Sequence, residues 1–363
     1  MKSHIGLKLK YNKLIIILLS LSLLAVTLHT QPVHATWSEA GSYPYYRKIT
    51  IDSGDVDATL TNFPVLVYLD ASNTDWSHVQ DDLDDIRFIA SDNSTVLKYE
   101  IEDYTVNTNA WLWVKIPSVS NVADTVFWIY HGNTGASSGE DAVNVWDANY
   151  VMVQHLQETG TDTSIRYDST SHDTDLTVQD LTDGDATGEI DGADDFELDN
   201  TDYEYRGDDA TLDLTTFTVE LWFSCESLTA EPQFLIEKRE LGQNDYFLNW
   251  RLDVIGTTDK MRTYYGDGSS FSTILESTSS VESSWSHVAS VMDNANDNFY
   301  LYVNGTEEAS DLTATLTPHT AGNHNTTIGC GGPTPDKWFD GIIDEIRISS
   351  NARAASWLKA SYE

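Results

Sequence analysis

The sequence predicts an all-β protein that contains two successive β-sandwiches. Short apolar or alternating runs recur along the chain, and turn residues separate them at a spacing typical of sandwiches. The composition agrees, because 11 Trp and 18 Tyr favour strands while 21 Gly and eight Pro favour turns. A length of 363 residues is enough for two domains.

Residues 1–35 are predicted to be a secretory signal peptide. Four lysines form its charged region, and the run from Leu14 to Val26 is apolar but too short for a comfortable membrane span. Ala35 supplies a small residue at the expected cleavage point. An uncleaved anchor is the alternative. We therefore expect a secreted protein, extracellular or held at the cell surface, with no membrane span after signal removal.

The charge of the chain is strongly acidic. The sequence has 58 Asp and Glu against 20 Lys and Arg, and its pI is about 4.2. Without the signal segment, 16 basic and 58 acidic residues remain, a net charge of −42. Nucleic acids and anionic membrane surfaces would be repelled, so neither is expected as a partner. The acids are compatible with calcium binding, and equally with a solubilising surface.

Residues 36–147 are expected to form the first β-sandwich. Pro64 stands at the entrance of an apolar strand, where a missing backbone donor is tolerated. The expected strands contain Arg47–Ile51, Phe63–Leu69, Asp85–Ile89, Leu97–Glu102, Trp111–Pro117 and Thr125–Tyr130.

This unit resembles a secreted domain-of-unknown-function family, number 2341. The resemblance lies in the runs Tyr46–Ile51, Asn62–Val67, Asp85–Phe88, Tyr99–Glu102, Trp113–Pro117 and Tyr130–Asn133. The family usually shows Tyr-Tyr-Gly-Asn at the last of these, whereas this chain has His131 before Gly-Asn. The resemblance implies an architecture and no chemistry. It also implies that a concanavalin-A-like jelly roll follows directly.

Residues 148–363 resemble such a concanavalin-A-like, laminin-G-like jelly roll. An Asn-Gly pair at 304–305 is a hairpin signal, and the tail at 352–362 resembles the short helix that often follows the last strand. The runs that carry the resemblance are Val151–Leu156, Phe217–Phe223, Ser284–Val291, Phe299–Gly305, Thr327–Gly329 and Trp338–Ser349. No long linker separates the two units, so we expect them to pack together.

The closing strand of the second unit has an irregular pattern. Ile342, Ile346 and Ile348 are expected on one apolar face, and Asp344 shares that face at the two-residue period. A buried Asp is unfavourable unless it accepts hydrogen bonds or binds a cation.

A polar and aromatic sheet face of the jelly roll is the expected ligand-binding surface. The alternation of two strands places Phe217, Val219, Leu221 and Phe223, and then Tyr246, Leu248, Trp250, Leu252 and Val254, toward the core. A concave face of aromatic, amide and charged groups can stack against and hydrogen-bond a sugar ring. A solvated or domain-packed face is the alternative. The candidate ligand-binding residues are Glu220, Trp222, Asn249, Arg251, Tyr300 and Tyr302.

Two acidic segments are candidate calcium sites. The first has oxygen ligands at the spacing of a calcium loop, in Asp183, Asp185, Thr187, Asp191 and Asp194. Its twelfth position is Asp rather than Glu, and a solvated loop is the alternative. The second is implied by the resemblance, since pentraxin relatives of the jelly roll bind calcium through acid and amide residues before the equivalent strand. Asn244 and Asp245 align there, and Asp336 is the residue expected to converge with them; the pentraxins' later acidic cluster is not reproduced.

Cys225 and Cys330 are a candidate disulfide. Pairing requires their Cα atoms to lie within about 7 Å, which the sequence leaves open.

The sequence gives little support for catalysis. The carboxylates of Glu100 and Glu102 share a strand face, but that strand lies in the first unit and is expected to edge a sheet. No alternating acid motif of jelly-roll hydrolases occurs. We therefore expect a noncatalytic binding protein for an extracellular glycan or cell-surface protein, with calcium as an optional cofactor. A structural or adhesive surface component is the main alternative, and a glycoside hydrolase or lyase the weaker one.

Overall fold

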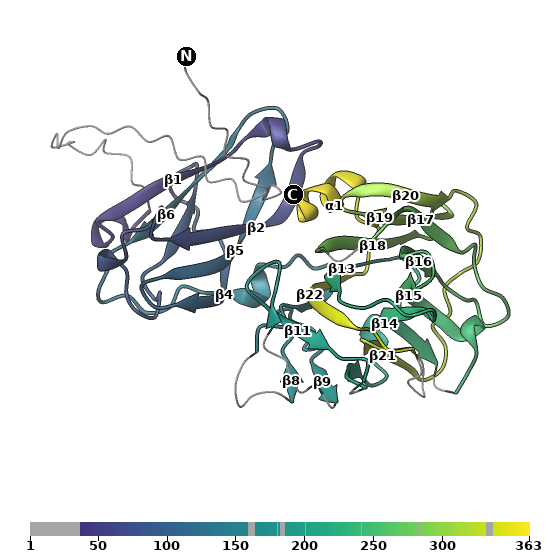
Figure 1. Ribbon diagram of the computed structural model, residues 1–363. Helices are drawn as coiled ribbons and strands as arrows, with labels where there is room; N and C mark the ends of the chain where they lie inside the picture. Colours follow the sequence, from purple (N-terminus) through teal and green to yellow (C-terminus); the bar gives the residue numbers. More distant parts are fainter. Residues whose placement is uncertain are drawn as a thin grey trace, which may run out of the picture.

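The structure is a computed structural model that describes residues 37–158, 164–179, 181, 186–199, 201–240, 242–281, 284–331 and 337–363. The expected signal peptide lies outside these residues. Two β-rich units lie side by side, and the described chain ends at their junction (Figure 1). No helix in the described part of the chain is long and apolar enough to cross a membrane.

The first unit contains two three-stranded antiparallel sheets, in the orders β1-β6-β3 and β2-β5-β4. Its strands are β1 Tyr45–Ile51, β2 Leu60–Asp70, β3 Arg87–Ala90, β4 Tyr99–Thr105, β5 Asn109–Val119 and β6 Thr125–His131. Pro64 lies within β2, which is an edge strand, so its missing backbone donor leaves no ladder bond unmade. All six predicted strands are confirmed, with ends shifted by at most three residues.

Short 3₁₀ turns connect several of these strands and strands of the second unit. They are η1 Ala40–Ser42, η2 Ser53–Asp55, η3 Trp76–His78, η4 Ala142–Asn144, η5 Ala210–Leu212 and η6 Asp245–Phe247.

The second unit is a sandwich of two eight-stranded sheets. The front sheet, next to the first unit, has the order β10-β11-β22-β13-β18-β19-β20, with β7 paired to β22. Its strands are β7 Tyr150–Gln154, β10 Ala186–Thr187, β11 Gly192–Phe196, β13 Phe217–Cys225, β18 Ser286–Asp293, β19 Asn298–Val303, β20 Thr306–Asp311 and β22 Gly341–Ser349.

The back sheet has the order β17-β16-β15-β14-β21-β12-β9-β8. Its strands are β8 Ile165–Arg166, β9 Leu176–Gln179, β12 Tyr203–Arg206, β14 Gln233–Glu240, β15 Leu248–Ile255, β16 Lys260–Tyr264, β17 Leu275–Ser280 and β21 His324–Ile328.

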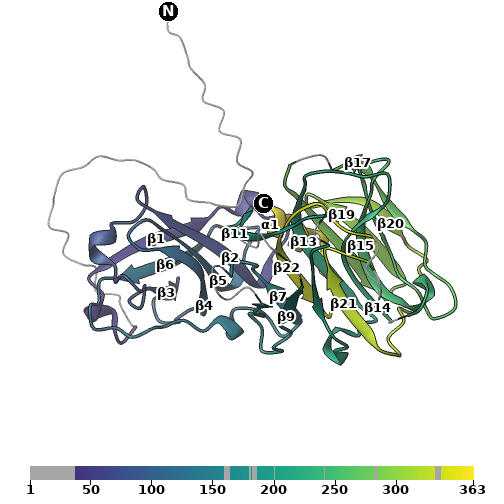
Figure 2. The same ribbon diagram turned by 60° about the horizontal axis from the view of Figure 1, so that its bottom comes forward.

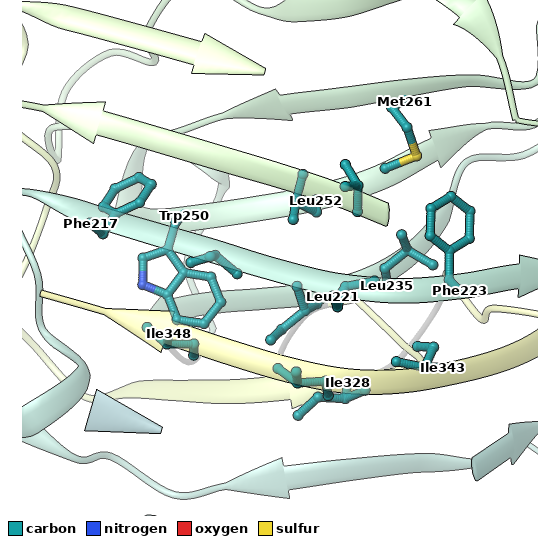
Figure 3. Packing of buried hydrophobic residues seen from close by; sticks show 14 of the residues in the cluster. Phe217, Leu221, Phe223, Leu235, Trp250, Leu252, Met261, Ile328, Ile343 and Ile348 are labelled. Carbon is teal, nitrogen blue, oxygen red and sulfur yellow. The ribbon is translucent and has the colours of Figure 1, made fainter. Parts of the chain in front are cut away.

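The core of the second unit lies between these two sheets. β13 and β22 contribute from the front, while β14, β15 and β21 contribute from the back (Figure 3). The alternation predicted for β13 and β15 is confirmed within the strands, because their expected inward residues are buried. The inward placement of Tyr246 was wrong, since it lies in η6 before β15 and is 38% exposed. The core residues labelled in the figure are Phe217, Leu221, Phe223, Leu235, Trp250, Leu252, Met261, Ile328, Ile343 and Ile348.

A β-bulge explains the irregular pattern of β22. Trp222 pairs with Asp344 but Glu220 pairs with Arg347, so an extra residue is inserted on β22 between these pairs. Glu345, at φ 51°, takes the unusual conformation of the bulge. The insertion reverses the alternation, and Ile343 rather than Ile342 joins the core. Placing Asp344 on the apolar face was therefore wrong, since it shares the outer face with Trp222.

The C-terminal helix α1, Ala355–Tyr362, confirms the predicted tail helix and lies at the junction of the units in both views (Figures 1 and 2). Trp357 packs edge-on against Phe63 of β2, with ring centroids 4.8 Å apart. Trp357, Tyr150 and Val153 belong to the same buried cluster as the core of the first unit. The two units are therefore packed against each other through a continuous apolar contact, as expected from the missing linker.

Candidate functional site

A pocket opens where the two units and α1 meet. Its cavity volume is about 90 Å³, and it opens to solvent. Aromatic rings come from all three parts, and the charged groups come from the second unit and the tail. The lining residues include Phe63, Trp111 and Trp113 from the first unit, Glu189, Trp222 and Arg347 from the second, and Tyr362 and Glu363 from the tail.

Strand alternation delivers these rings to one place. Trp111 and Trp113 are two residues apart on β5, so both point out of the same face of the first unit. Trp222 points out of the front sheet because its neighbours Leu221 and Phe223 fill the core. Tyr362 of α1 stacks on Trp222, with ring centroids 5.6 Å apart. The facing outer surfaces of two sheets therefore form an aromatic wall.

Arg347 connects the pocket to a buried charge cluster. Its guanidinium carbon lies 4.4 Å from the centroid of the Trp113 ring, within cation–π range. On the same side chain, Nε donates to Glu345 Oε2 at 3.1 Å. Burial alone would lower the pKa of Arg347, but the carboxylate of Glu345 outweighs it and raises the pKa. Arg347 therefore stays charged at the pocket wall.

The imidazole of His155 lies at the centre of this cluster, among three glutamates. Its Nδ1 contacts Glu345 and is 3.7 Å from Glu102 Oε2, while Nε2 is 3.6 Å from Glu100 Oε2. Burial would lower the pKa of His155, but the three carboxylates raise it well above its ordinary value. His155 is therefore an imidazolium that joins two carboxylates of the first unit to one of the second.

Tryptophan indoles hold the two glutamates of the first unit. Trp113 Nε1 donates to Glu102 at 2.6 Å, and Trp146 Nε1 donates to Glu100 at 2.8 Å. Burial and the charge of Glu345 raise the pKa of Glu102 well above its ordinary value. The strand that carries these acids, β4, is at the edge of its sheet as expected, and both acids are buried at the contact between the units.

Two further carboxylates extend the cluster along the same boundary. Asp344 accepts a hydrogen bond from Ile190 N at 2.9 Å, and burial followed by the charge of Glu345 raises its pKa. Asp191, in the turn between β10 and β11, faces Asp103 of β4. Burial and a hydrogen bond with Asp103 raise the pKa of Asp191 to about 7. The two aspartates therefore share a proton across the boundary near neutral pH.

The front sheet does not present the open binding face that was expected. Glu220 is only 1% exposed and Tyr302 only 5% exposed, and Trp222 is buried as well. α1 covers part of this face: Leu358 packs with Tyr302, and Tyr300 lies partly buried beside them. The prediction of an open binding face was wrong because the first unit and α1 pack onto this face. The alternative prediction, a sheet face packed against another domain, describes this face. Of these candidate residues, only Trp222 lines the pocket.

The other two candidate ligand residues lie on β15 of the back sheet and are also buried. Asn249 bonds both backbone groups of Leu214, donating at 2.9 Å and accepting at 3.2 Å. Arg251 lies on the outer face, where it pairs with Glu237 at 2.8 Å and with Asp245 at 3.1 Å. These polar groups are therefore engaged inside the protein, and they lie apart from the pocket.

The described part of the first calcium candidate is a β-hairpin. Thr187 pairs with Gly192 across it, and Asp191 occupies its turn. Asp194 is fully buried on β11, and both of its oxygens accept hydrogen bonds from Arg166, at 2.5 and 2.6 Å. The carboxylate of Asp194 is therefore engaged by the guanidinium of Arg166. Asp183 and Asp185 lie outside the described residues, so calcium binding by them stays a prediction.

The second calcium candidate is used for internal contacts where it is described. Asn244 accepts a hydrogen bond at the start of η6. Asp245 pairs with Arg239 at 2.7 Å and accepts from the Tyr264 hydroxyl at 2.8 Å. Burial opposes the ionisation of Asp245, but Arg251 and these groups lower its pKa. Asp336 lies outside the described residues.

Cys225 and Cys330 are both buried and are not joined by a disulfide in the structure. The candidate disulfide is therefore wrong.

Comparison with known proteins gives the family of each unit. Residues 82–205 match the family described as a domain of unknown function, DUF2341. Residues 198–359 match the concanavalin A-like lectin/glucanases superfamily. The chain joins a DUF2341 domain to a concanavalin A-like domain. This confirms both resemblances and their order. The DUF2341 match extends past β6 into strands of the second unit, and no curated protein matches the chain.

Several solved structures are similar to part of this chain. Domain 4 of an extracellular arabinanase from Geobacillus stearothermophilus, in complex with arabinotriose, is 19% identical, covering 60% of this chain and 100% of that one, with a TM-score of 0.45. The CBM40 module of the Ruminococcus gnavus IT-sialidase, bound to α2,6-sialyllactose, is 18% identical, covering 43% and 92%, with a TM-score of 0.39. A heptameric pentraxin from Limulus polyphemus is 13% identical, covering 41% and 70%, with a TM-score of 0.34. Identities this low carry no binding residue over to this chain.

Sequence reasoning missed most of the residues between the DUF2341 and concanavalin A-like domains. Trp111 to Ile116 is apolar on both faces, which is typical of a strand covered on both sides. That signal could have placed a partner surface on β5. Nothing in the sequence connects Arg347 to Trp113 or His155 to Glu102, because these pairs come from different domains.

Proposed function

We propose that this chain is a noncatalytic binding protein for an extracellular glycan, and that the interdomain pocket takes up the ligand. The observation that carries the proposal is the convergence of Trp111, Trp222 and Tyr362 on one pocket that also holds Arg347 and Glu189. Aromatic faces pack against the apolar faces of sugar rings, and charged groups at the edge bind hydroxyls. The lectin-containing superfamily of the second domain supports the same class of ligand.

The shape and charge of the site favour a short neutral glycan over a protein surface. The pocket is a small concavity of about 90 Å³, which suits part of a sugar unit at most, whereas protein partners generally need larger, flatter contacts. The chain after the signal segment has a net charge of −42, which would repel anionic polysaccharides. The noncatalytic part of the proposal is motivated by Glu100 and Glu102, which are engaged by indoles below the pocket.

A neutral-glycan array tests the proposal, using the chain from Thr36 onward with millimolar calcium and again with EDTA. Trp111→Ala and Tyr362→Ala should each weaken binding by about tenfold, as expected for the loss of one stacked ring. Phe271→Ala removes an exposed ring distant in sequence from the pocket and should change nothing. Absence of any binder would overturn glycan recognition, and release of reducing sugar would overturn the noncatalytic assignment. Binding lost only in EDTA would assign calcium a supporting role.

A structural or adhesive role is the second candidate, and an exposed aromatic strip on the DUF2341 domain favours it. Tyr45 and Tyr46 of β1 are 42% and 39% exposed. Tyr45 lies beside His131, and Tyr46 stacks on Tyr130. Contiguous exposed rings are typical of protein contact surfaces. Cell-surface retention that Tyr45→Ser with Tyr46→Ser abolishes would support this role, and a monomer with no affinity for cells would exclude it.

A further inference from the structure

Two histidines and a glutamate meet at one end of the back sheet, away from the pocket. Glu240 ends β14 and His324 begins β21, and the two residues are directly paired across the strands. His319 approaches from the segment that precedes β21. One ligand atom of each of these three residues lies within 4.8 Å of the other two.

The two imidazoles already point nitrogen toward nitrogen. His319 Nδ1 is 3.0 Å from His324 Nε2. Two nitrogens bound to one Zn²⁺ at about 2.0–2.1 Å each lie at most about 4 Å apart. The observed distance therefore falls within the span of a shared metal ion.

Two glycines with positive φ leave room for these side chains. A Cβ on Gly322, at φ 118°, would come within 2.8 Å of Glu240 Oε1. A Cβ on Gly268, at φ 89°, would come within 2.8 Å of the His319 ring. Both backbone conformations favour glycine, and the missing Cβ at each position leaves space for the side chain of Glu240 or His319. Close backbone approach of this kind is a feature of built sites.

His324 has the environment of a ligand rather than that of a surface histidine. It is fully buried, and its Nε2 is the nitrogen that faces His319. Asp208 and Asp213 approach the same ring and add negative charge around it.

We propose that Glu240, His319 and His324 bind a divalent transition-metal ion of the zinc class. Two imidazoles and a carboxylate suit such ions, whereas calcium prefers oxygen ligands alone. Glu240 and His319 are partly exposed, so the ion can enter and leave through them. Three protein ligands leave coordination positions for water or another ligand atom. This site is separate from the glycan pocket, and neither proposal depends on the other.

The test uses the whole chain from Thr36, stripped of metal with EDTA and dialysed. Zn²⁺ is titrated against a chromophoric chelator, and Co²⁺ is followed by its visible absorption, which reports its ligand geometry. We expect one tight site per chain. His319→Ala and Glu240→Gln should each weaken Zn²⁺ binding at least tenfold and change the Co²⁺ spectrum. Both variants alter partly exposed residues, and melting curves without metal check that they fold.

His172→Ala is the matched control, because it removes an exposed histidine outside the cluster and should leave the affinity unchanged. Zn²⁺ binding that persists unchanged in both ligand variants overturns the proposal. Binding that is instead lost in His155→Gln also overturns it, since Glu102, His155 and Glu345 form a separate cluster of His and carboxylate donors. No binding at 100-micromolar Zn²⁺, an excess of about a hundredfold over a micromolar site, overturns it as well.

Discussion

The guanidinium of Arg347, from the concanavalin A-like domain, rests on the indole of Trp113, from the DUF2341 domain. The same indole donates its N–H to Glu102. The face of the Trp113 ring therefore contacts the concanavalin A-like domain, and its N–H edge contacts its own DUF2341 domain. Both contacts are buried, and both lie beside the pocket. The pocket wall and the domain contact are therefore made of the same residues.

Arg347→Ala should destabilise the protein by about 3–5 kcal/mol, because it leaves the buried carboxylate of Glu345 without its guanidinium. Urea unfolding of the chain from Thr36 measures this loss. Arg47→Ala removes an exposed arginine of β1 and should change stability by less than about 0.5 kcal/mol. Equal midpoints for the two variants would contradict the assigned role of Arg347.

Asp191→Asn should flatten the dependence of stability on pH. In the folded protein the pKa of Asp191 is raised to about 7, from an unfolded value near 3.8. The folded state therefore binds the extra proton, and this contribution to stability is full below pH 3.8 and is lost as pH rises through 7. Melting temperatures from pH 4 to 8 should show a decline in the parent that is smaller in the variant. Parallel curves would show that the proton is not shared with Asp103.

Asp245→Asn should lower the melting temperature to the same extent in millimolar calcium and in EDTA. The carboxylate pairs with Arg239 and Arg251, and its loss leaves two cations with fewer partners. Thermal unfolding in both buffers measures the difference. A larger loss in calcium would instead identify Asp245 as a calcium ligand, as the pentraxin resemblance implied.

Both cysteines should resist thiol reagents in the folded protein. Burial raises the pKa of Cys225 to about 12, so very little reactive thiolate forms at pH 8. A chromogenic disulfide reagent should label neither residue quickly in the native chain and both in guanidinium chloride. Failure to label them in denaturant without a reductant would reveal a disulfide and contradict the structure.

The strands could be predicted because local alternation encodes them. Phe217–Phe223 places every second residue in the core, and Asn304 and Gly305 form the expected hairpin between β19 and β20. The misplacement of Asp344 has a local cause as well. A strict two-residue period cannot accommodate the extra residue at Glu345, although the acid in an apolar run did mark the irregular position.

The candidate site could not be predicted, because it depends on how two domains meet. Trp222 was assigned to the outer face correctly, but its burial comes from α1 and from the other domain. The His155 cluster assembles side chains that are far apart in sequence, and their charges pair only in the folded chain. Alternation says which face a residue occupies and says nothing of what covers that face.

The position of Trp357 makes the folding of the DUF2341 domain depend on the far end of the chain. Phe63 of β2 packs on Trp357, so these two residues meet only after almost the whole sequence has been synthesised. Contacts of such high sequence separation slow folding, and unfinished chains leave apolar surface exposed in the meantime. A ribosome-bound or truncated chain that lacks α1 would therefore hold an incomplete first domain, and proteolysis near the C-terminus would loosen the domain that was made first.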